Sequence, residues 1–112
     1  MKMYGDYIKE RLGDEMISSE NGFATYRLID HCGQPAVYII DLYVRPDFRK
    51  ENIASELADE VVKKGCAAGC KHLIGTVVPS SNNSTNSLKV LLGYGMNLYS
   101  ASTDLIVFKK EI

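Results

Sequence analysis

Cysteine and tryptophan are scarce in this sequence, which has three residues of the first kind and none of the second. The odd set of Cys32, Cys66 and Cys70 cannot close into a complete disulfide framework. Too few further histidines or cysteines stand near Cys66 and Cys70 for a tetrahedral metal site. We therefore expect no bound metal, and free thiols that are buried or half-buried in a reducing cytoplasm.

Long apolar runs and a strong charge of either sign are also absent. No apolar segment approaches the roughly 20 residues that a membrane span requires, and no secretory signal stands at the start. The net charge of -1 provides no general attraction to nucleic acid or to an anionic membrane. The sequence therefore predicts a soluble, cytoplasmic protein that has neither a membrane nor nucleic acid as a partner.

The chain does have the composition of an ordinary globular domain. Its 112 residues are 46% apolar and 24% charged, which is typical of a folded domain. A chain of this size buries roughly two-thirds of its unfolded surface, so it can fold without disulfides or metals. We expect residues 1–112 to form a single domain with one core.

The first third of the chain predicts a helix followed by antiparallel strands. Apolar residues at helical spacing indicate a helix over residues 3–12, and a short strand follows at 16–18. The pair Asn21-Gly22 is typical of a tight primed turn, in which the central residues have positive φ. The pattern then predicts a strand over 23–29 and a loop over 30–35.

The remaining sequence predicts a crossover between two buried strands. Residues 36–44 are almost wholly apolar and rich in β-branched and aromatic side chains, which suits a central strand covered on both faces. The periodicity becomes helical at Asn52, and we then expect a strand at 72–78, a short helix at about 84–92 and strands at 96–100 and 104–110. A strand, a helix and a second buried strand imply a right-handed parallel crossover, so the predicted fold class is α/β with a mixed sheet.

The junction between the first buried strand and its helix has the chemistry of an anion site. The first backbone N–H groups of a helix lack partners inside the helix, and the helix dipole is positive there. Such a terminus suits a phosphate or pyrophosphate. Arg49 and Lys50 add positive charge beside it, and the small Ala54 allows a ligand to approach the backbone.

This junction resembles the acetyl-CoA signature of the GNAT N-acetyltransferase superfamily. In that signature, a strand ending in Val-x-Pro leads to Arg/Gln-x-x-Gly-x-Gly/Ala. Here Val44 and Pro46 match the strand end, Arg49 matches the leading Arg, and Ala54 matches the closing Gly/Ala. Asn52 stands where the family has glycine, but asparagine tolerates unusual backbone angles and is a good helix N-cap.

A second region of the chain resembles the same family. Val78 is followed by Asn82 and then by Leu92-Gly93-Tyr94, as a strand end and an asparagine precede a short helix closing with Gly-Phe in the family. The resemblance covers residues 23–108. It implies a GNAT-like fold that is truncated at the N-terminus, because the family's first strand and one early helix have no counterpart here.

The resemblance also implies a cosubstrate, acetyl-CoA, and a set of residues that bind it. The strands 36–44 and 72–78 would splay apart and hold the pantetheine arm, while the helix terminus would hold the pyrophosphate. The residues expected to bind the cofactor are Leu42, Tyr43, Val44, Arg49, Lys50, Glu51, Asn52, Ile53, Ala54, Ser55 and Asn82.

The catalytic groups are less well defined. Asp41 is the one acid inside the central strand and is our candidate base for deprotonating the amine, although a carboxylate bonded to the sheet edge is the alternative. Many family members have a tyrosine as general acid about four residues before the Gly-Phe pair, and Lys89 occupies that position here. Tyr94 is a candidate proton donor, as are Tyr38, Tyr43 and Tyr99.

These observations predict an N-acetyltransferase that transfers an acetyl group from acetyl-CoA to an amine of a protein or a small molecule. A short domain with few walls around the acceptor would admit a protein lysine or N-terminus more readily than it would enclose a metabolite. Two alternatives stay open. One is a catalytically silent domain that binds CoA or another protein, and the other is a structural module that forms a homodimer through an exposed edge strand.

Overall fold

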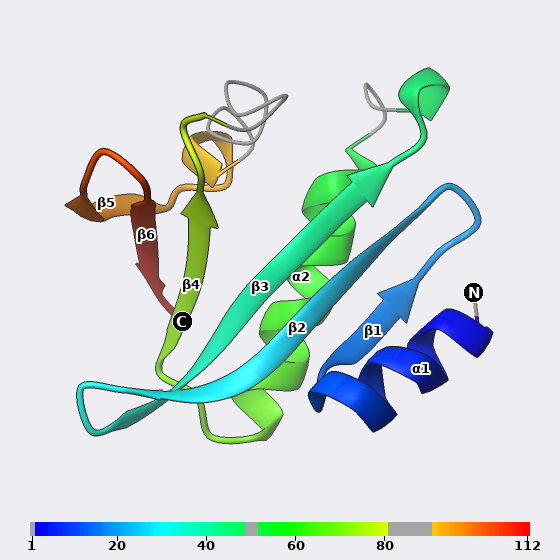
Figure 1. Cartoon of the computed structure of the whole chain (residues 1–112), viewed down its shortest axis with the longest axis horizontal. Helices are drawn as coiled ribbons and strands as arrows, with labels where there is room; N and C mark the ends of the chain where they lie inside the picture. Colours follow the sequence, from blue (N-terminus) through cyan, green and yellow to red (C-terminus); the bar gives the residue numbers. More distant parts are fainter. Residues whose placement is uncertain (1, 49–51, 81–90) are drawn as a thin grey trace.

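The computed structural model describes residues 2–48, 52–80 and 91–112. Six strands form a single sheet in the order β1-β2-β3-β4-β6-β5 (Figure 1). Among the strands of the described residues, only β3 and β4 pair in parallel, and α2 lies between them in the chain. The predicted mixed α/β sheet with one parallel crossover is thereby confirmed. The elements are α1 (Lys2–Leu12), β1 (Glu15–Ser18), β2 (Gly22–His31), β3 (Gln34–Val44), the 3-10 helix η1 (Pro46–Phe48), α2 (Ile53–Ala67), β4 (His72–Val77), β5 (Asn97–Ala101) and β6 (Ile106–Glu111).

The primed turn lies at the second hairpin and not at the first, where the sequence predicted it. Neither Asn21 nor Gly22 has a positive φ, so the predicted primed turn at this pair is wrong. Gly22 is instead needed for close packing, because a Cβ there would collide with the carbonyl oxygen of Tyr43. The primed geometry lies at the other hairpin, where Cys32 has φ 54° and Gly33 has φ 82°. The loop predicted over 30–35 is therefore only two residues long, and β2 and β3 extend into it.

One face of the sheet carries the main core and is covered by α2, which lies behind β2 and β3 in Figure 1. Val37 of β3, Leu73 of β4 and Val61 of α2 are fully buried there. Helix and sheet approach closely at Gly65, where a Cβ would lie only 2.7 Å from Val37 Cγ1. The helix predicted from Asn52 is thus held against the sheet by its apolar stripe.

The opposite face is covered only in part. Helix α1 packs over β1 and β2, where Gly5 faces Met16 and the ring of Tyr4 lies 6.0 Å from that of Phe23. The carboxyl half of β3 projects Asp41 and Tyr43 from this face, and both side chains are exposed. The prediction that this strand is covered on both faces is therefore wrong for its second half, because α1 does not extend that far.

The predictions for the thiols and for the last elements have mixed outcomes. Cys70 is buried, but Cys32 and Cys66 are exposed, so the prediction of three buried or half-buried thiols is wrong for two of them. The last two predicted strands are confirmed as β5 and β6. Most of the helix predicted at 84–92 lies outside the described residues. None of the helices in the described ranges has the length and apolar character to cross a membrane.

Candidate active site

The parallel strands β3 and β4 diverge halfway along β3. Their ladder runs from Ala36↔His72 to Ile39↔Gly75 and then ends, whereas β3 continues to Val44. A β-bulge at Ile40 marks the same point, because Tyr26 pairs with Ile39 while Thr25 pairs with Asp41. The bulge bends β3 away from β4 and opens a gap in the sheet backbone. This is the divergence of strands that the resemblance implied.

Two hydroxyl groups meet across the strands at the start of the gap. Tyr38 Oη on β3 and Thr76 Oγ1 on β4 lie 2.9 Å apart, close enough for one to donate a hydrogen bond to the other. Both side chains lie on the face of the sheet away from α2. Tyr38 was one of several candidate proton donors in the sequence, but nothing in the sequence pointed to Thr76, because the pair depends on the register of the parallel strands.

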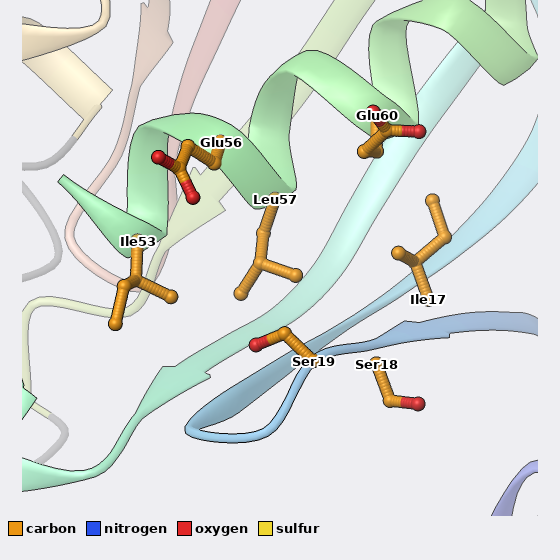
Figure 2. A pocket seen from close by; sticks show the side chains of 7 residues that line it. All are labelled: Ile17, Ser18, Ser19, Ile53, Glu56, Leu57 and Glu60. Atoms are coloured by element: carbon orange, nitrogen blue, oxygen red, sulfur yellow. The ribbon is translucent and has the colours of Figure 1, made fainter.

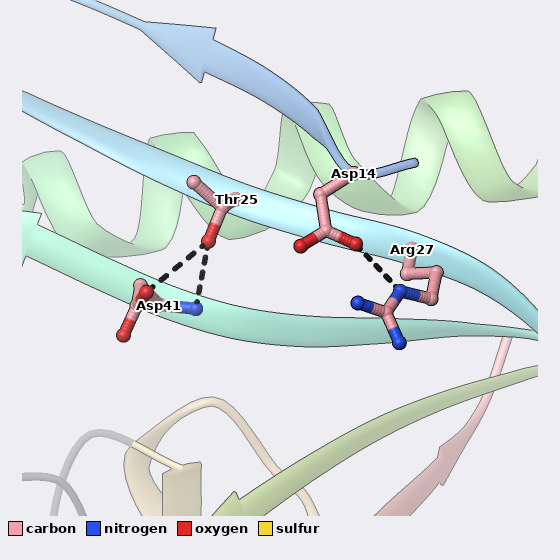
Figure 3. A network of polar contacts seen from close by, with 4 residues as sticks. All are labelled: Asp14, Thr25, Arg27 and Asp41. Atoms are coloured by element: carbon pink, nitrogen blue, oxygen red, sulfur yellow. Dashed lines mark hydrogen bonds and ion pairs between the residues drawn. The ribbon is translucent and has the colours of Figure 1, made fainter. Parts of the chain in front are cut away.

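Asp41 lies one residue beyond the bulge and keeps an open carboxylate. Its backbone N–H donates to Thr25 Oγ1 at 3.1 Å, and Thr25 is only 3% exposed (Figure 3). The threonine hydroxyl reaches the Asp41 carboxylate only at 3.5 Å, the outer limit of a hydrogen bond. Thr25 therefore fixes the backbone of Asp41, while the carboxylate stays accessible for a cation or a proton.

An ion pair between a buried carboxylate and an exposed arginine supports the same face of the sheet. Asp14, at the end of the α1–β1 connection, is 4% exposed and accepts a hydrogen bond from Arg27 Nε on β2 (Figure 3). The Asp14 carboxylate raises the pKa of Arg27 through this hydrogen bond and through its charge. Arg27 pairs directly with Tyr38 in the sheet, so this ion pair positions the strand next to the two hydroxyls.

The helix terminus that we expected to bind phosphate begins at Asn52. This residue has a left-handed conformation, with φ 61° and ψ 16°, as the tolerance of asparagine for unusual angles predicts. Its side chain makes no capping hydrogen bond, so the interpretation of Asn52 as a side-chain N-cap is wrong. The first intrahelical bond is donated by the Glu56 N–H to the Asn52 carbonyl oxygen. By helix geometry, the N–H groups of Ile53, Ala54 and Ser55 have no partner inside the helix.

The predicted site residues fall into two groups, one outside the described residues and one on β3. Arg49, Lys50 and Glu51 precede the helix terminus, and Asn82 and Lys89 follow β4, but all five lie outside the described residues. Leu42, Tyr43 and Val44 lie on β3 beyond the end of the β3–β4 ladder. The structure thus brings the strand residues and the helix terminus to the two ends of one connection.

A hollow of about 290 Å³ lies on the α2 face, between the end of β1 and the first half of α2 (Figure 2). Among the described residues, its lining has two carboxylates and no basic side chain, so these side chains offer no positive charge to a pyrophosphate. The lining residues are Ile17, Ser18, Ser19, Ile53, Glu56, Leu57 and Glu60. Of the described residues that were predicted to bind the cofactor, only Ile53 lines it.

Tyr94 lies on the α2 side of the sheet, where Asp59 and Lys110 contact it. Its hydroxyl donates to Asp59 Oδ1 at 2.6 Å, and Lys110 Nζ lies 4.4 Å from the ring centre and donates to the Tyr94 carbonyl oxygen. Burial raises the pKa of Tyr94, and the hydrogen bond to Asp59 raises it further. Asp59 lies six residues after the start of α2, about 9 Å along the helix axis. Tyr94 thus keeps its proton and links the chain after β4 to α2.

Comparison with solved structures identifies the fold. A GNAT-family protein from Desulfovibrio desulfuricans is similar with a TM-score of 0.75 and 14% identity, over 95% of this chain and 75% of that chain. A Bacillus subtilis acetyltransferase in complex with CoA has a TM-score of 0.67 at 14% identity, over 96% of this chain and 83% of that chain. Arabidopsis thaliana NAA60 in complex with acetyl-CoA has a TM-score of 0.64 at 20% identity, over 81% of this chain. The chain spans only 65% of the length of the NAA60 structure. The architecture is therefore that of the GNAT acetyltransferases.

Family membership rests on the sequence itself. The sequence model of the Acetyltransferase (GNAT) family matches residues 21–94, which include both diverging strands, the bulge and the terminus of α2. The chain therefore belongs to the GNAT acetyltransferase family. A comparison with curated proteins found no match.

Proposed function

We propose that residues 1–112 form a single domain that transfers an acetyl group from acetyl-CoA to an amine. The observation that carries this proposal is the divergence of β3 and β4 at Ile40, in the middle of the strand that leads to α2. A gap in the sheet and a helix terminus whose first N–H groups have no partner inside the helix suit the two halves of CoA, its pantetheine arm and its pyrophosphate. The family match over residues 21–94 includes both features.

The cofactor would bind along β3 and around the start of α2. The backbone of Leu42, Tyr43 and Val44 would pair with the amide groups of pantetheine, which takes the place of a neighbouring strand. The N–H groups of residues 52–55 would hold the pyrophosphate together with Arg49, Lys50 and the backbone of Glu51, and Asn82 would contact the pantetheine arm. Two similar structures contain acetyl-CoA or CoA, which supports this proposal.

In the reaction, the nitrogen of a neutral amine attacks the thioester carbonyl carbon, the C–S bond breaks, and CoA leaves as a thiolate that takes up a proton. Asp41 is the proposed base, because its carboxylate is open and its backbone is fixed by Thr25. The Tyr38–Thr76 pair is better placed than Tyr94 to pass a proton to the thiolate, because the Tyr94 hydroxyl is already bound by Asp59. A role for Lys89 as the acid stays a prediction.

A second candidate function is CoA binding without turnover. One observation favours it: the Tyr94 hydroxyl, a candidate acid in the sequence, is bound to Asp59 on the α2 side. The two functions share the cofactor site and differ only in chemistry, so a binding measurement must be paired with an assay of acetyl transfer.

We would first measure binding of acetyl-CoA by calorimetric titration of the wild type and an Arg49→Glu variant. We expect micromolar affinity for the wild type and a loss of at least tenfold in the variant, because charge reversal places a carboxylate beside the pyrophosphate. Lys64→Glu, at the far end of α2, is the matched charge-reversal control and should leave the affinity unchanged.

An Asn52→Gly variant tests whether the backbone conformation at this position is sufficient for binding. Glycine adopts the left-handed conformation without strain. We expect the variant to bind at least as tightly as the wild type. No detectable binding by a folded wild type would overturn the proposal, whereas binding without transfer to any amine would support the silent CoA-binding function.

A further inference from the structure

The site restricts the direction from which an amine can approach. On the α2 face, the region of the strand divergence is packed core, with Ile39 8%, Val77 4% and Leu57 3% exposed. On the opposite face, the groups are polar or reactive, and Asp41 is exposed. An amine that attacks a thioester held between β3 and β4 therefore arrives from the face away from α2.

That face also carries a row of three aromatic rings next to Asp41. The ring of Phe23 lies 5.8 Å from that of Tyr43 and 6.0 Å from that of Tyr4. Phe23 pairs with Tyr43 in the sheet just as Thr25 pairs with Asp41, so the row starts immediately beside the carboxylate. Tyr4 is 41% exposed and Tyr43 is 44% exposed, so the row offers apolar surface to a ligand.

The spacing between carboxylate and aromatic row selects among amines. Two residues along a strand span about 7 Å, so an amine at Asp41 has aromatic surface within about that distance. In a peptide, the first side chain branches from the carbon that carries the α-amine and reaches this surface directly. A lysine ε-amine instead ends an unbranched methylene stem, which offers less apolar surface to the three rings than a large side chain does. The arrangement therefore favours an α-amine.

The charges on this face also suit a peptide α-amine as the acceptor. A peptide N-terminus is an ammonium ion before it loses its proton, and the open Asp41 carboxylate attracts it. Arg27, the basic side chain two residues beyond Thr25 on β2, is paired with Asp14. Its positive charge is thereby offset and does not compete for Asp41.

We propose that the acceptor is the α-amine of a peptide or protein whose first residue has a large apolar side chain. The amine lies at Asp41, the side chain packs on Phe23 and Tyr43, and Tyr4 of α1 closes the end of the row. This inference rests on the proposed acetyltransferase function and names its substrate class.

The test measures kcat/KM for three hexapeptides with saturating acetyl-CoA. Two have free α-amines and differ only in the first residue, leucine or serine, and the third has a blocked N-terminus and one internal lysine. For the wild type we expect kcat/KM for the leucine peptide to exceed that for each of the other two at least tenfold. Phe23→Ser should lower the ratio of leucine to serine peptide about fivefold or more.

Two further variants distinguish a change in specificity from a loss of folding. Tyr4→Ser, on the exposed end of the row, should lower the ratio about threefold. Leu98→Ser removes an apolar side chain that is even more exposed than Tyr4 from β5, at the other edge of the sheet, and should leave the ratio unchanged. An equal loss of activity toward all peptides in Phe23→Ser and Tyr4→Ser would count against the proposal.

The outcomes separate this inference from the function on which it rests. Equal kcat/KM values for the leucine and serine peptides, or a preference for the internal lysine, would overturn the inference and leave the acetyltransferase function standing. Binding of acetyl-CoA without transfer to any of the three peptides would overturn the inference and leave the cofactor site standing. A folded protein that does not bind acetyl-CoA would overturn both.

Discussion

Asn52 differs from the family pattern and still preserves the local backbone structure. Asn52 stands where the family has glycine, yet it adopts the left-handed conformation that glycine would supply. Most other residues would pay about 1–2 kcal/mol for that conformation. The start of α2 therefore keeps its backbone geometry, and its N–H groups keep their direction, despite the substitution.

The hydrogen bond from the Tyr94 hydroxyl to Asp59 explains this tyrosine by stability alone. The pH dependence of stability tests that explanation. We expect Tyr94→Phe to lower the free energy of unfolding by about 1 kcal/mol at neutral pH, because a hydrogen bond to a partly exposed carboxylate is lost. The folded state raises the pKa of this tyrosine, so its stabilising effect is fully present below the unfolded pKa of about 10 and declines above it.

Urea denaturation at pH 7 and above pH 10 measures this effect. The difference between the wild type and Tyr94→Phe should narrow at the higher pH, while Tyr7→Phe, an exposed tyrosine of α1, should match the wild type at pH 7. Acetyl transfer should survive in Tyr94→Phe. A variant that keeps full stability but loses transfer would instead assign the tyrosine a catalytic role.

At the scale of elements, the bulge in β3 has the greatest consequence. A strand that continued its ladder with β4 past Ile39 would leave no gap in the sheet backbone. The extra residue, Ile40, bends the strand, and it also sets which side chains point away from α2 beyond this point. Asp41 and Tyr43 therefore share a face with Tyr38.

The contact between α2 and β3 predicts a specific cost for a small substitution. Gly65→Ala adds a Cβ only 2.7 Å from Val37 Cγ1, and Val37 is fully buried. Overpacking of this kind typically costs 1–3 kcal/mol, partly offset by the better helix propensity of alanine. We expect a net loss of about 1–2 kcal/mol in chemical denaturation.

Gly93→Ala is the control for this prediction, because no heavy atom of the described residues lies within 4 Å of the added Cβ and φ there is not positive. It should leave stability unchanged or raise it slightly. If Gly65→Ala were as stable as Gly93→Ala, the close approach of α2 to the sheet would not be a constraint on this fold.

For the whole molecule, the two faces of the sheet have different tasks. The face under α2 holds the core and supplies stability, whereas the other face holds the open carboxylate, the paired hydroxyls and the aromatic row. The sheet ends in two edge strands, β1 and β5, and β5 exposes Leu98 and Tyr99. Association of two copies through an exposed edge strand stays a prediction.

Binding of the cofactor should stabilise the molecule as a unit. A ligand at 100 times its dissociation constant contributes about 2.7 kcal/mol to folding, and each kcal/mol shifts the melting temperature of a domain of about 100 residues by about 4 °C or more. We therefore expect acetyl-CoA at this concentration to raise the melting temperature by about 10 °C. Arg49→Glu, which should bind at least tenfold more weakly, should show about half of this shift or less at the same ligand concentration, and an equal shift in both proteins would place the cofactor elsewhere.

The order of elements, the parallel crossover and the family were predictable from the sequence, because each depends on local patterns. Helical periodicity, apolar strands and the Arg49-to-Ala54 spacing all extend over short segments of chain. Even the left-handed conformation at Asn52 follows from the preferences of one residue. The exchange of turn geometries between Asn21-Gly22 and Cys32-Gly33 was missed, because the role of Gly22 is set by the β3 backbone opposite it.

The composition of the reactive face was decided by the tertiary structure alone. The pairs Tyr38–Thr76, Thr25–Asp41 and Asp14–Arg27 join residues that lie 13 to 38 positions apart in the chain. Which of them face one another depends on the strand register and on a single extra residue at Ile40. Because side chains alternate between the two faces of a strand, a shift of one residue would have turned Asp41 and Tyr43 into the core.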